Sequence, residues 1–111
     1  MGALATFGLV QPASADTKNV TITVNDWNCM LDGRYQGTIT GALIEVVPGN
    51  NPPAKWEGRS RNVNVIYQPS GSRVAIAIQI FCKTTWYGAG YYRTISTGRW
   101  VDRNTSSDWQ V

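Results

Sequence analysis

One eleven-residue segment, residues 73–83 (RVAIAIQIFCK), constrains the fold more than any other part of the chain. Its apolar residues recur at every second position, which is the period of a β-strand with one buried face. The set predicted to be buried is Val74, Ile76, Ile78, Ile80 and Cys82. Full burial of each aliphatic member stabilises a fold by about 1.5–3 kcal/mol. We therefore expect this segment to be the central strand of a small β domain.

The rest of the sequence also favours strands, because no stretch of useful length has apolar residues at helical spacing. Within 34–47 the buried parity changes near Gly41, which predicts a bulge or a bend between two strands. Residues 68–72 are predicted to form a hairpin loop, and Thr97-Gly98 a further turn. The other predicted strands lie at 19–25, 27–31, 34–47, 61–67, 84–87, 91–96, 99–102 and 108–111, the last at a sheet edge. Seven to nine strands with short turns predict an all-β fold, a single small antiparallel β-sandwich or a closed barrel.

The amino-terminal residues 1–15 have the character of a secretory signal peptide. Residues 3–10 are apolar and uncharged, and Ala13-Ser14-Ala15 supplies the small residues that precede a cleavage site. The run is shorter than the ~20 residues needed to span a bilayer. No Lys or Arg precedes it, so a disordered apolar amino terminus is the alternative. We expect a secreted protein in which 16–111 form a single β domain.

The two cysteines, Cys29 and Cys82, predict one disulfide bond in an exported chain. A cross-link between these positions would stabilise the domain by about 4 kcal/mol on the chain-entropy model. Two free thiols are the alternative. A tetrahedral metal site is not expected, because the chain has no histidine and no third cysteine.

The formal net charge of +3 is unevenly distributed along the chain. Residues 55–103 contain eight basic residues against Glu57 and Asp102, a net charge of +6. This half of the chain is the one that would attract an anionic partner. The alternative is that its basic residues, which form no continuous run, are solvated strand positions.

The absence of histidine removes the commonest general base and the usual partner of a nucleophile. Two carboxylate pairs, Glu45 with Glu57 and Asp26 with Asp32, remain as the acid and base of a glycoside hydrolase. The sequence context favours turns and strand ends for these acids. We therefore predict no catalytic residues, no cofactor and no enzyme activity.

A weak calcium motif follows the last basic segment. Oxygen-bearing side chains alternate at Asp102, Asn104, Ser106 and Asp108. The glycine expected within such a loop is Ser107, and no closing glutamate follows. A polar turn is the preferred interpretation, and no metal is predicted.

Aromatic residues gather around the turn at 88–90, interleaved with basic residues. The predicted ligand-binding set is Trp86, Tyr87, Tyr91, Tyr92, Arg93, Arg99 and Trp100. Adjacent residues in a strand face opposite sides, so one ring of each neighbouring pair should enter the core and the other should stay exposed. Exposed rings beside arginine stack on sugars or bases, while guanidinium groups hold phosphate or carboxylate. The alternative is cross-strand aromatic pairing that only stabilises the sheet.

Together these features favour a secreted, non-catalytic binding or interaction module. Its expected partner is an extracellular polysaccharide, an anionic envelope polymer or a protein, including a hydrolase that would be inhibited through the Pro-rich loop 49–53. A cationic antimicrobial or toxin-like protein is the alternative, and a small carboxylate-dependent hydrolase is the third hypothesis. We expect neither a nucleic-acid partner nor a membrane span.

Overall fold

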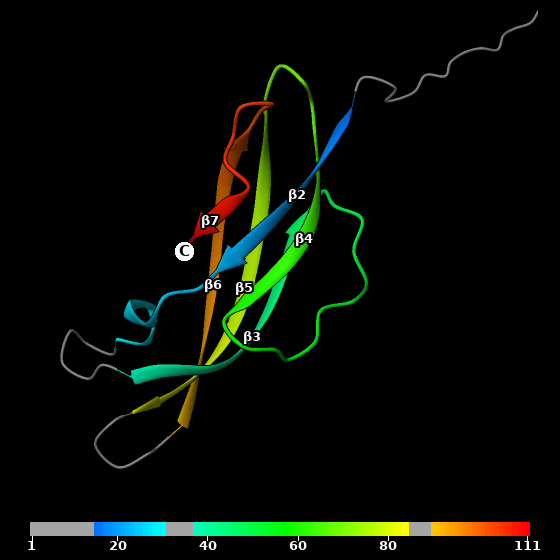
Figure 1. Cartoon of the computed structure of the whole chain (residues 1–111). Coiled ribbons are helices and arrows are strands. Elements are labelled where there is room, and N and C mark those ends of the chain that lie inside the picture. Colours follow the sequence, from blue (N-terminus) through cyan, green and yellow to red (C-terminus); the bar gives the residue numbers. More distant parts are fainter. Residues whose placement is uncertain (1–14, 31–36, 85–89) are drawn as a thin grey trace, which may run out of the picture.

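A computed structural model describes residues 15–30, 37–84 and 90–111, and these form two three-stranded sheets packed against each other (Figure 1). One sheet has the order β4-β2-β7, with β2 at Asp16–Thr23, β4 at Ser60–Tyr67 and β7 at Asp108–Gln110. The other has the order β3-β5-β6, with β3 at Gly37–Val47, β5 at Ser72–Thr84 and β6 at Gly90–Val101. The all-β prediction is confirmed, with the sheets arranged as a sandwich. The described residues contain six strands, close to the predicted seven to nine. The predicted signal peptide lies outside the described residues except for Ala15.

The central strand is β5, as the alternating pattern predicted. It pairs antiparallel with β3 on one side and β6 on the other. Its five predicted inward residues are each at most 3 % exposed, and they meet inward residues of the opposite sheet in one core. That core includes Val20, Ile22, Val63, Val65 and Trp109.

The predicted irregularity at Gly41 is also confirmed. The register of β3 against β5 shifts between Ile39 and Gly41. β3 nevertheless runs as one strand through this point, so the parity change reflects a bulge and not a break between two strands. The bulge lets Ile39, Ala42 and Ile44 all reach the core.

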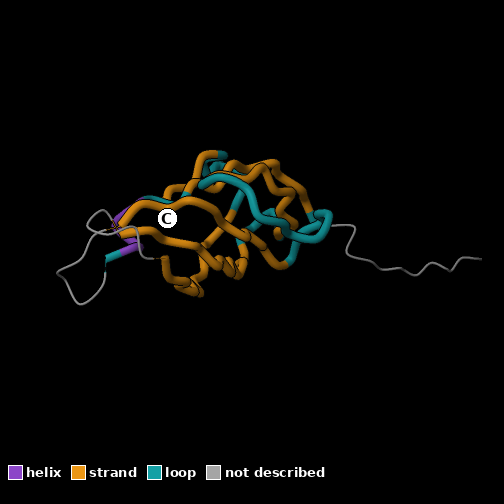
Figure 2. The backbone as a smooth tube through the Cα atoms, turned by 90° about the horizontal axis from the view of Figure 1, so that it is seen from below, coloured by secondary structure: helices purple, strands orange, loops and turns teal. Residues whose placement is uncertain are grey.

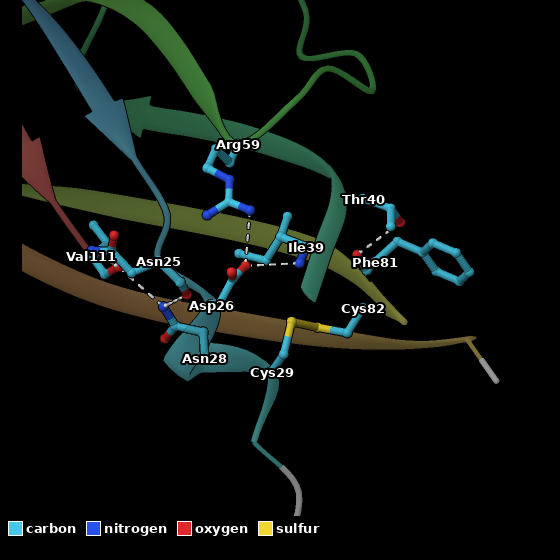
Figure 3. Close-up of polar contacts among 10 residues, drawn as sticks. All are labelled: Asn25, Asp26, Asn28, Cys29, Ile39, Thr40, Arg59, Phe81, Cys82 and Val111. Atoms are coloured by element: carbon cyan, nitrogen blue, oxygen red, sulfur yellow. Dashed lines mark hydrogen bonds and ion pairs between the residues drawn. A yellow bond between two sulfur atoms is a disulfide. The ribbon is translucent and has the colours of Figure 1, made fainter. Parts of the chain in front are cut away.

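The strand predicted at 27–31 is wrong where the structure describes it, because Asp26–Cys29 form a 3₁₀ helix, η1. Asp26 holds this turn in place: its carboxylate accepts a hydrogen bond from the Ile39 N–H at 3.0 Å and lies 3.1 Å from the Arg59 guanidinium (Figure 3). Cys29 is bonded to Cys82, with their Cα atoms 5.7 Å apart, which confirms the disulfide. Contacts with residues distant in the sequence therefore override the β-like composition. Figure 2 shows η1 at one end of the strand layers.

Two predicted turns also differ from the structure. β6 runs through Thr97-Gly98 without a turn, because β5 pairs with it as far as Ser72↔Val101. The segment 68–72 does not close a hairpin, because β4 and β5 belong to different sheets. It carries the chain from one layer to the other, and Gly71 adopts φ 109°, a left-handed conformation that favours glycine.

One long side of the sandwich is closed by the connection between β3 and β4. Asn51 pairs with the backbone of Asn64 through both side-chain atoms, at 2.6 and 3.0 Å. Arg61 donates to the carbonyls of Ile44 and Pro52, each at 2.8 Å.

On the other long side, β7 is a three-residue edge strand that pairs in parallel with β2. That pairing confirms the edge position and departs from an all-antiparallel fold. No helix in the described part of the chain is long and apolar enough to cross a membrane.

Candidate functional site

Strand β6 separates the predicted binding residues onto two faces. Tyr92 and Trp100 lie on the outer face of the β3-β5-β6 sheet and are 62 % and 57 % exposed. Tyr91, Arg93 and Arg99 have the opposite parity and lie on the side that faces the other sheet. The predicted split of Tyr91 and Tyr92 between core and surface is therefore observed. Trp86 and Tyr87 lie outside the described residues.

On the outer face, Tyr92 belongs to a cluster of three rings. The ring centroid of Tyr92 lies 4.9 Å from that of its cross-strand partner Phe81 and 5.9 Å from that of Trp56. Both pairs are tilted, by 49° and 46° respectively, which is a favourable arrangement for aromatic rings. In Figure 3 the Phe81 ring points away from the disulfide and the core. We call Trp56, Phe81 and Tyr92 the outer aromatic cluster.

Trp56 reaches this cluster because the β3–β4 connection folds back onto β3. The backbones of Ala42 and Glu57 exchange two hydrogen bonds, at 3.0 and 3.1 Å, in an isolated antiparallel bridge. This bridge places the Trp56 ring beside the bulge at Gly41. The bulge and the bridge thus position Trp56, a loop residue, on the outer face of the β3-β5-β6 sheet.

The cluster borders a surface depression of about 380 Å³. Besides the rings, its lining contains the Thr40 hydroxyl, Gly41 and the exposed Glu57. Among the described residues, no basic group lies within ion-pair distance of the Glu57 carboxylate. The Phe81 ring packs over Gly90 on β6, where a Cβ would come within 2.3 Å of the ring. The Thr40 hydroxyl donates to the Phe81 carbonyl at 3.3 Å, so its oxygen can still accept a hydrogen bond from a ligand (Figure 3). The depression therefore combines ring faces with two groups, this hydroxyl oxygen and the Glu57 carboxylate, that can accept hydrogen bonds.

The outer face continues from the cluster as a strip of small and polar side chains. These are Ala75, Ala77, Gln79, Thr94 and Ser96, all of them exposed. The strip ends at Trp100, whose direct cross-strand partner is the exposed Arg73. Tyr92 and Trp100 are eight residues apart on one strand, which corresponds to about 26 Å at ~3.3 Å per residue. The face is thus an uncovered strip with aromatic side chains at both ends.

On the inner side, Tyr91 and Arg93 fasten the end of β6 to the segment around η1. The Tyr91 hydroxyl donates to the Cys29 carbonyl, and Arg93 donates to the Met30 carbonyl. Burial raises the pKa of Tyr91 above its ordinary value of 10.0, while the positive charge of Arg93 opposes the rise. These two side chains make structural contacts at one end of the sheet.

The weak calcium motif forms a hydrogen-bonded turn between β6 and β7. The Asp102 carboxylate accepts hydrogen bonds from the Asn104 N–H at 2.8 Å and the Thr105 hydroxyl at 3.2 Å. The Lys18 ammonium donates to the backbone carbonyls of Asp102, Arg103 and Thr105. The carbonyl oxygens of this turn therefore accept hydrogen bonds from the positive side chain of Lys18. Within the described residues, no group of three or more His, Cys, Asp or Glu side chains is placed to hold a metal ion.

The carboxylates considered as the acid and base of a hydrolase have different surroundings. Asp26 is used by Arg59 and the Ile39 backbone, and Asp32 lies outside the described residues. Glu57 lines the depression, whereas Glu45 pairs with Ala77 on the middle of the sheet. Glu45 instead borders a second depression of about 360 Å³ together with Pro52, Pro53 and Arg61.

No protein-family model matches the sequence, and neither a curated protein nor a solved structure matches the chain.

The residues at the site were only partly predictable from the sequence. Phe81 shares the parity of the outward residues of β5, so its outward position follows from the same alternation that buries Ile80. Trp56 gives no such signal, because its position depends on the fold of a loop and on the Ala42–Glu57 bridge.

Proposed function

We propose that this protein is an exported, non-catalytic binding module whose outer β3-β5-β6 face binds a linear polysaccharide. The observation that carries the proposal is the outer aromatic cluster, in which Trp56 and Tyr92 are 47 % and 62 % exposed beside a depression of about 380 Å³. Large rings are normally buried to gain hydrophobic free energy, so two exposed rings in contact on one face favour a binding surface.

The chemistry of the depression suits a sugar ring. The face of a pyranose carries C–H groups, which pack on the electron-rich face of an aromatic ring. The hydroxyl groups at the edge of the sugar need hydrogen-bond partners, and Thr40 and Glu57 offer an alcohol and a carboxylate beside the rings. A pocket of this size falls at the lower end of the ~300–1,000 Å³ range typical of small-ligand sites, which suits one sugar residue at a time.

The shape of the face favours a polymer over a single sugar. The strip of small side chains between Tyr92 and Trp100 leaves room for a chain to lie along β5 and β6. A flat, β-linked hexose chain presents apolar faces along its length, so it can contact the cluster at one end of the strip and Trp100 at the other. Binding energy is then distributed over several weak subsites.

The placement of the basic residues supports this proposal over a cationic antimicrobial function. Arg59 and Arg103 form ion pairs with Asp26 and Asp16. Arg61 and Lys18 donate to backbone carbonyls. These four side chains are held against partners within the protein, so they are less free to reach toward an anionic surface, while the net charge stays at +3. The disulfide supports export, since such bonds persist in oxidising compartments.

The proposal is tested by affinity electrophoresis in gels containing hydroxyethylcellulose, xylan or laminarin, and by co-sedimentation with insoluble cellulose and chitin. We expect at least one of these polymers to retain the protein. Tyr92→Ala and Trp56→Ala should each weaken that retention by about tenfold, because one lost ring contact is worth roughly 1–1.5 kcal/mol. The melting temperature should change little, since both rings are exposed.

Trp27→Ala is the matched control, because Trp27 is 63 % exposed but lies on η1, away from the outer face. It should leave retention unchanged. Binding to a neutral polymer should also persist at 1 M salt, where the Debye length is about 3 Å. The proposal is wrong if none of the five polymers binds, or if the Trp27 variant loses as much binding as the Tyr92 variant.

A further inference from the structure

The side of the sandwich between β6 and β7 contains a cleft of about 450 Å³ that lies apart from the outer face. It exists because the two edge strands do not pair: β7 is three residues long and bonds only to β2, while β6 bonds only to β5. Its floor reaches the core at Ile76, which is 3 % exposed, and Ile95 and Val111 add apolar surface. The exposed Trp27 ring stands at its border.

The walls of the cleft are held by hydrogen bonds that do not depend on a ligand. The Asn28 side chain donates to the carbonyls of Asn25 and Val111, at 2.9 and 3.1 Å (Figure 3). Asn25 donates to the Val111 carbonyl through both its backbone, at 2.9 Å, and its side chain, at 3.2 Å. η1 is thereby fastened to the end of β7, so the cleft is preformed.

Arg99 has the one charged side chain in this lining. Its guanidinium lies over the buried Trp109 ring, 5.0 Å from the ring centroid, and the side chain is half-buried. Neither ion pair within the described residues involves Arg99, and no aspartate or glutamate lines the cleft. Arginine stays protonated in proteins, and its planar group binds carboxylate, sulfate or phosphate through two parallel hydrogen bonds. The cleft thus combines the Arg99 guanidinium, which no acidic side chain of the lining balances, with apolar surface at Ile76 and Ile95. The neutral polar side chains in the lining are Asn25, Asn28, Thr97 and Gln110.

We infer that the cleft binds a small organic anion that has an apolar body and one anionic head. The head would pair with the Arg99 guanidinium, which the Trp109 ring holds in position. The body would lie on Ile76 and Ile95 and meet the Trp27 ring at the border. This site is independent of the proposed polysaccharide face, because the inward and outward residues of β6 serve different sides of the sheet.

Octanoate is the probe, and 1-octanol and acetate are the matched ligands that lack the charge and the apolar chain. Isothermal titration calorimetry should give binding of octanoate that is at least about tenfold tighter than that of either comparison ligand, as expected for a charge-assisted contact next to buried apolar surface. Amide shifts in ¹⁵N spectra should centre on Asn28, Thr97, Arg99 and Gln110. The preference for octanoate should weaken as salt is added.

Arg99→Met keeps the apolar stem and removes the charge, so it should abolish the preference for octanoate over octanol. Arg99→Lys keeps the positive charge but removes the planar guanidinium that lies over Trp109, and it should retain that preference. Comparing the two variants separates loss of the charge from loss of the contact with Trp109. Arg103→Met is the control, since Arg103 is exposed and pairs with Asp16. Thr97→Trp should fill the cleft and reduce binding of both ligands while the melting temperature holds.

The inference is overturned by any of three results. Octanoate that binds no tighter than octanol would show that Arg99 does not recognise the head group. Unchanged octanoate binding by the Arg99→Met and Thr97→Trp variants would place the ligand elsewhere. Amide shifts confined to residues of the outer face, such as Tyr92 and Thr94, would assign the ligand to that face.

Discussion

The two faces of the β3-β5-β6 sheet are built from the same three strands and differ in almost every other respect. Between Val74 and Cys82, the inner face of β5 consists of branched aliphatic side chains and Cys82 itself, all at most 3 % exposed. The outer face of the same strand carries alanines, Gln79 and two basic residues, with Phe81 as its ring. No layer among the described residues covers the outer face.

This difference separates stability from recognition. The inner face contributes the apolar burial that a domain of this size needs, because small domains bury a modest fraction of their surface. The outer face contributes little burial, so its composition is free to serve a ligand. Substitutions on the inner face should therefore change the free energy of unfolding, and those on the outer face should change binding.

Loss of the disulfide, which ties the inner face of β5 to η1, is expected to have one of the two largest effects on stability. The double variant Cys29→Ala, Cys82→Ala should lower the free energy of unfolding by about 4 kcal/mol, because 53 residues separate the two positions and the open chain regains entropy. Urea denaturation measures this loss. Lys83→Ala, one residue away on the outer face, should change stability by at most about 0.5 kcal/mol. A comparable loss in both variants would contradict the division between the faces.

A second pair of variants tests neighbouring residues on opposite faces. Ile78→Ala removes a side chain that is 1 % exposed and should cost about 2–5 kcal/mol, because a cavity remains in the core. Gln79→Ala should cost at most about 0.5 kcal/mol, since Gln79 is exposed. Polysaccharide retention below the melting temperature should be the same for Ile78→Ala and the unmodified protein. If Gln79→Ala proves the more destabilising, the outer face is covered by a partner or by another part of the chain.

The alternation of β5 shows how far the sequence predicts these faces. A period of two determines which residues are inward, so the core positions of the central strand and the outward position of Phe81 follow from the pattern alone. The same rule separates Tyr91 from Tyr92. The rule does not predict that Tyr92 and Trp100 share a face until β6 is known to run without a turn, and Gly98 suggested a turn between them.

The parts that were not predictable depend on long-range contacts. Residues 27–31 have strand-like composition, but the Asp26 contacts with Ile39 and Arg59 hold a 3₁₀ turn at Asp26–Cys29. The position of Trp56 depends on a bridge between Glu57 and the bulged strand β3. The cleft beside Arg99 depends on the failure of β6 and β7 to pair, which is a property of the sheet order and not of any local segment.

The third prediction concerns the length of the outer face and affects binding alone. Trp100→Ala should not change the affinity for a trisaccharide that occupies only the outer aromatic cluster, because Trp100 lies about 26 Å away along β6. It should weaken binding of a long polymer by a few-fold, as one of several subsites is lost. Calorimetry with oligosaccharides of increasing length measures the difference. Equal effects on short and long ligands would place Trp100 and Tyr92 in one subsite and contradict the extended strip.

The smallest expected effect is a pH dependence that comes from the inner side of β6. Burial raises the pKa of Tyr91, so the folded protein favours the neutral phenol, which donates to the Cys29 carbonyl. A group whose pKa is raised on folding contributes stability that is full below its ordinary value of 10.0 and is lost as the pH rises through the folded value. Tyr91→Phe should therefore cost about 0.5–1.5 kcal/mol at pH 8, the net value of one hydrogen bond, and progressively less above pH 10. Thermal melts of both proteins from pH 8 to pH 11 measure the difference, and Tyr92→Phe, on the exposed outer face, should show no such trend. A difference between the Tyr91 variant and the unmodified protein that stays constant across this range would show that the phenol proton does not hold β6 to η1.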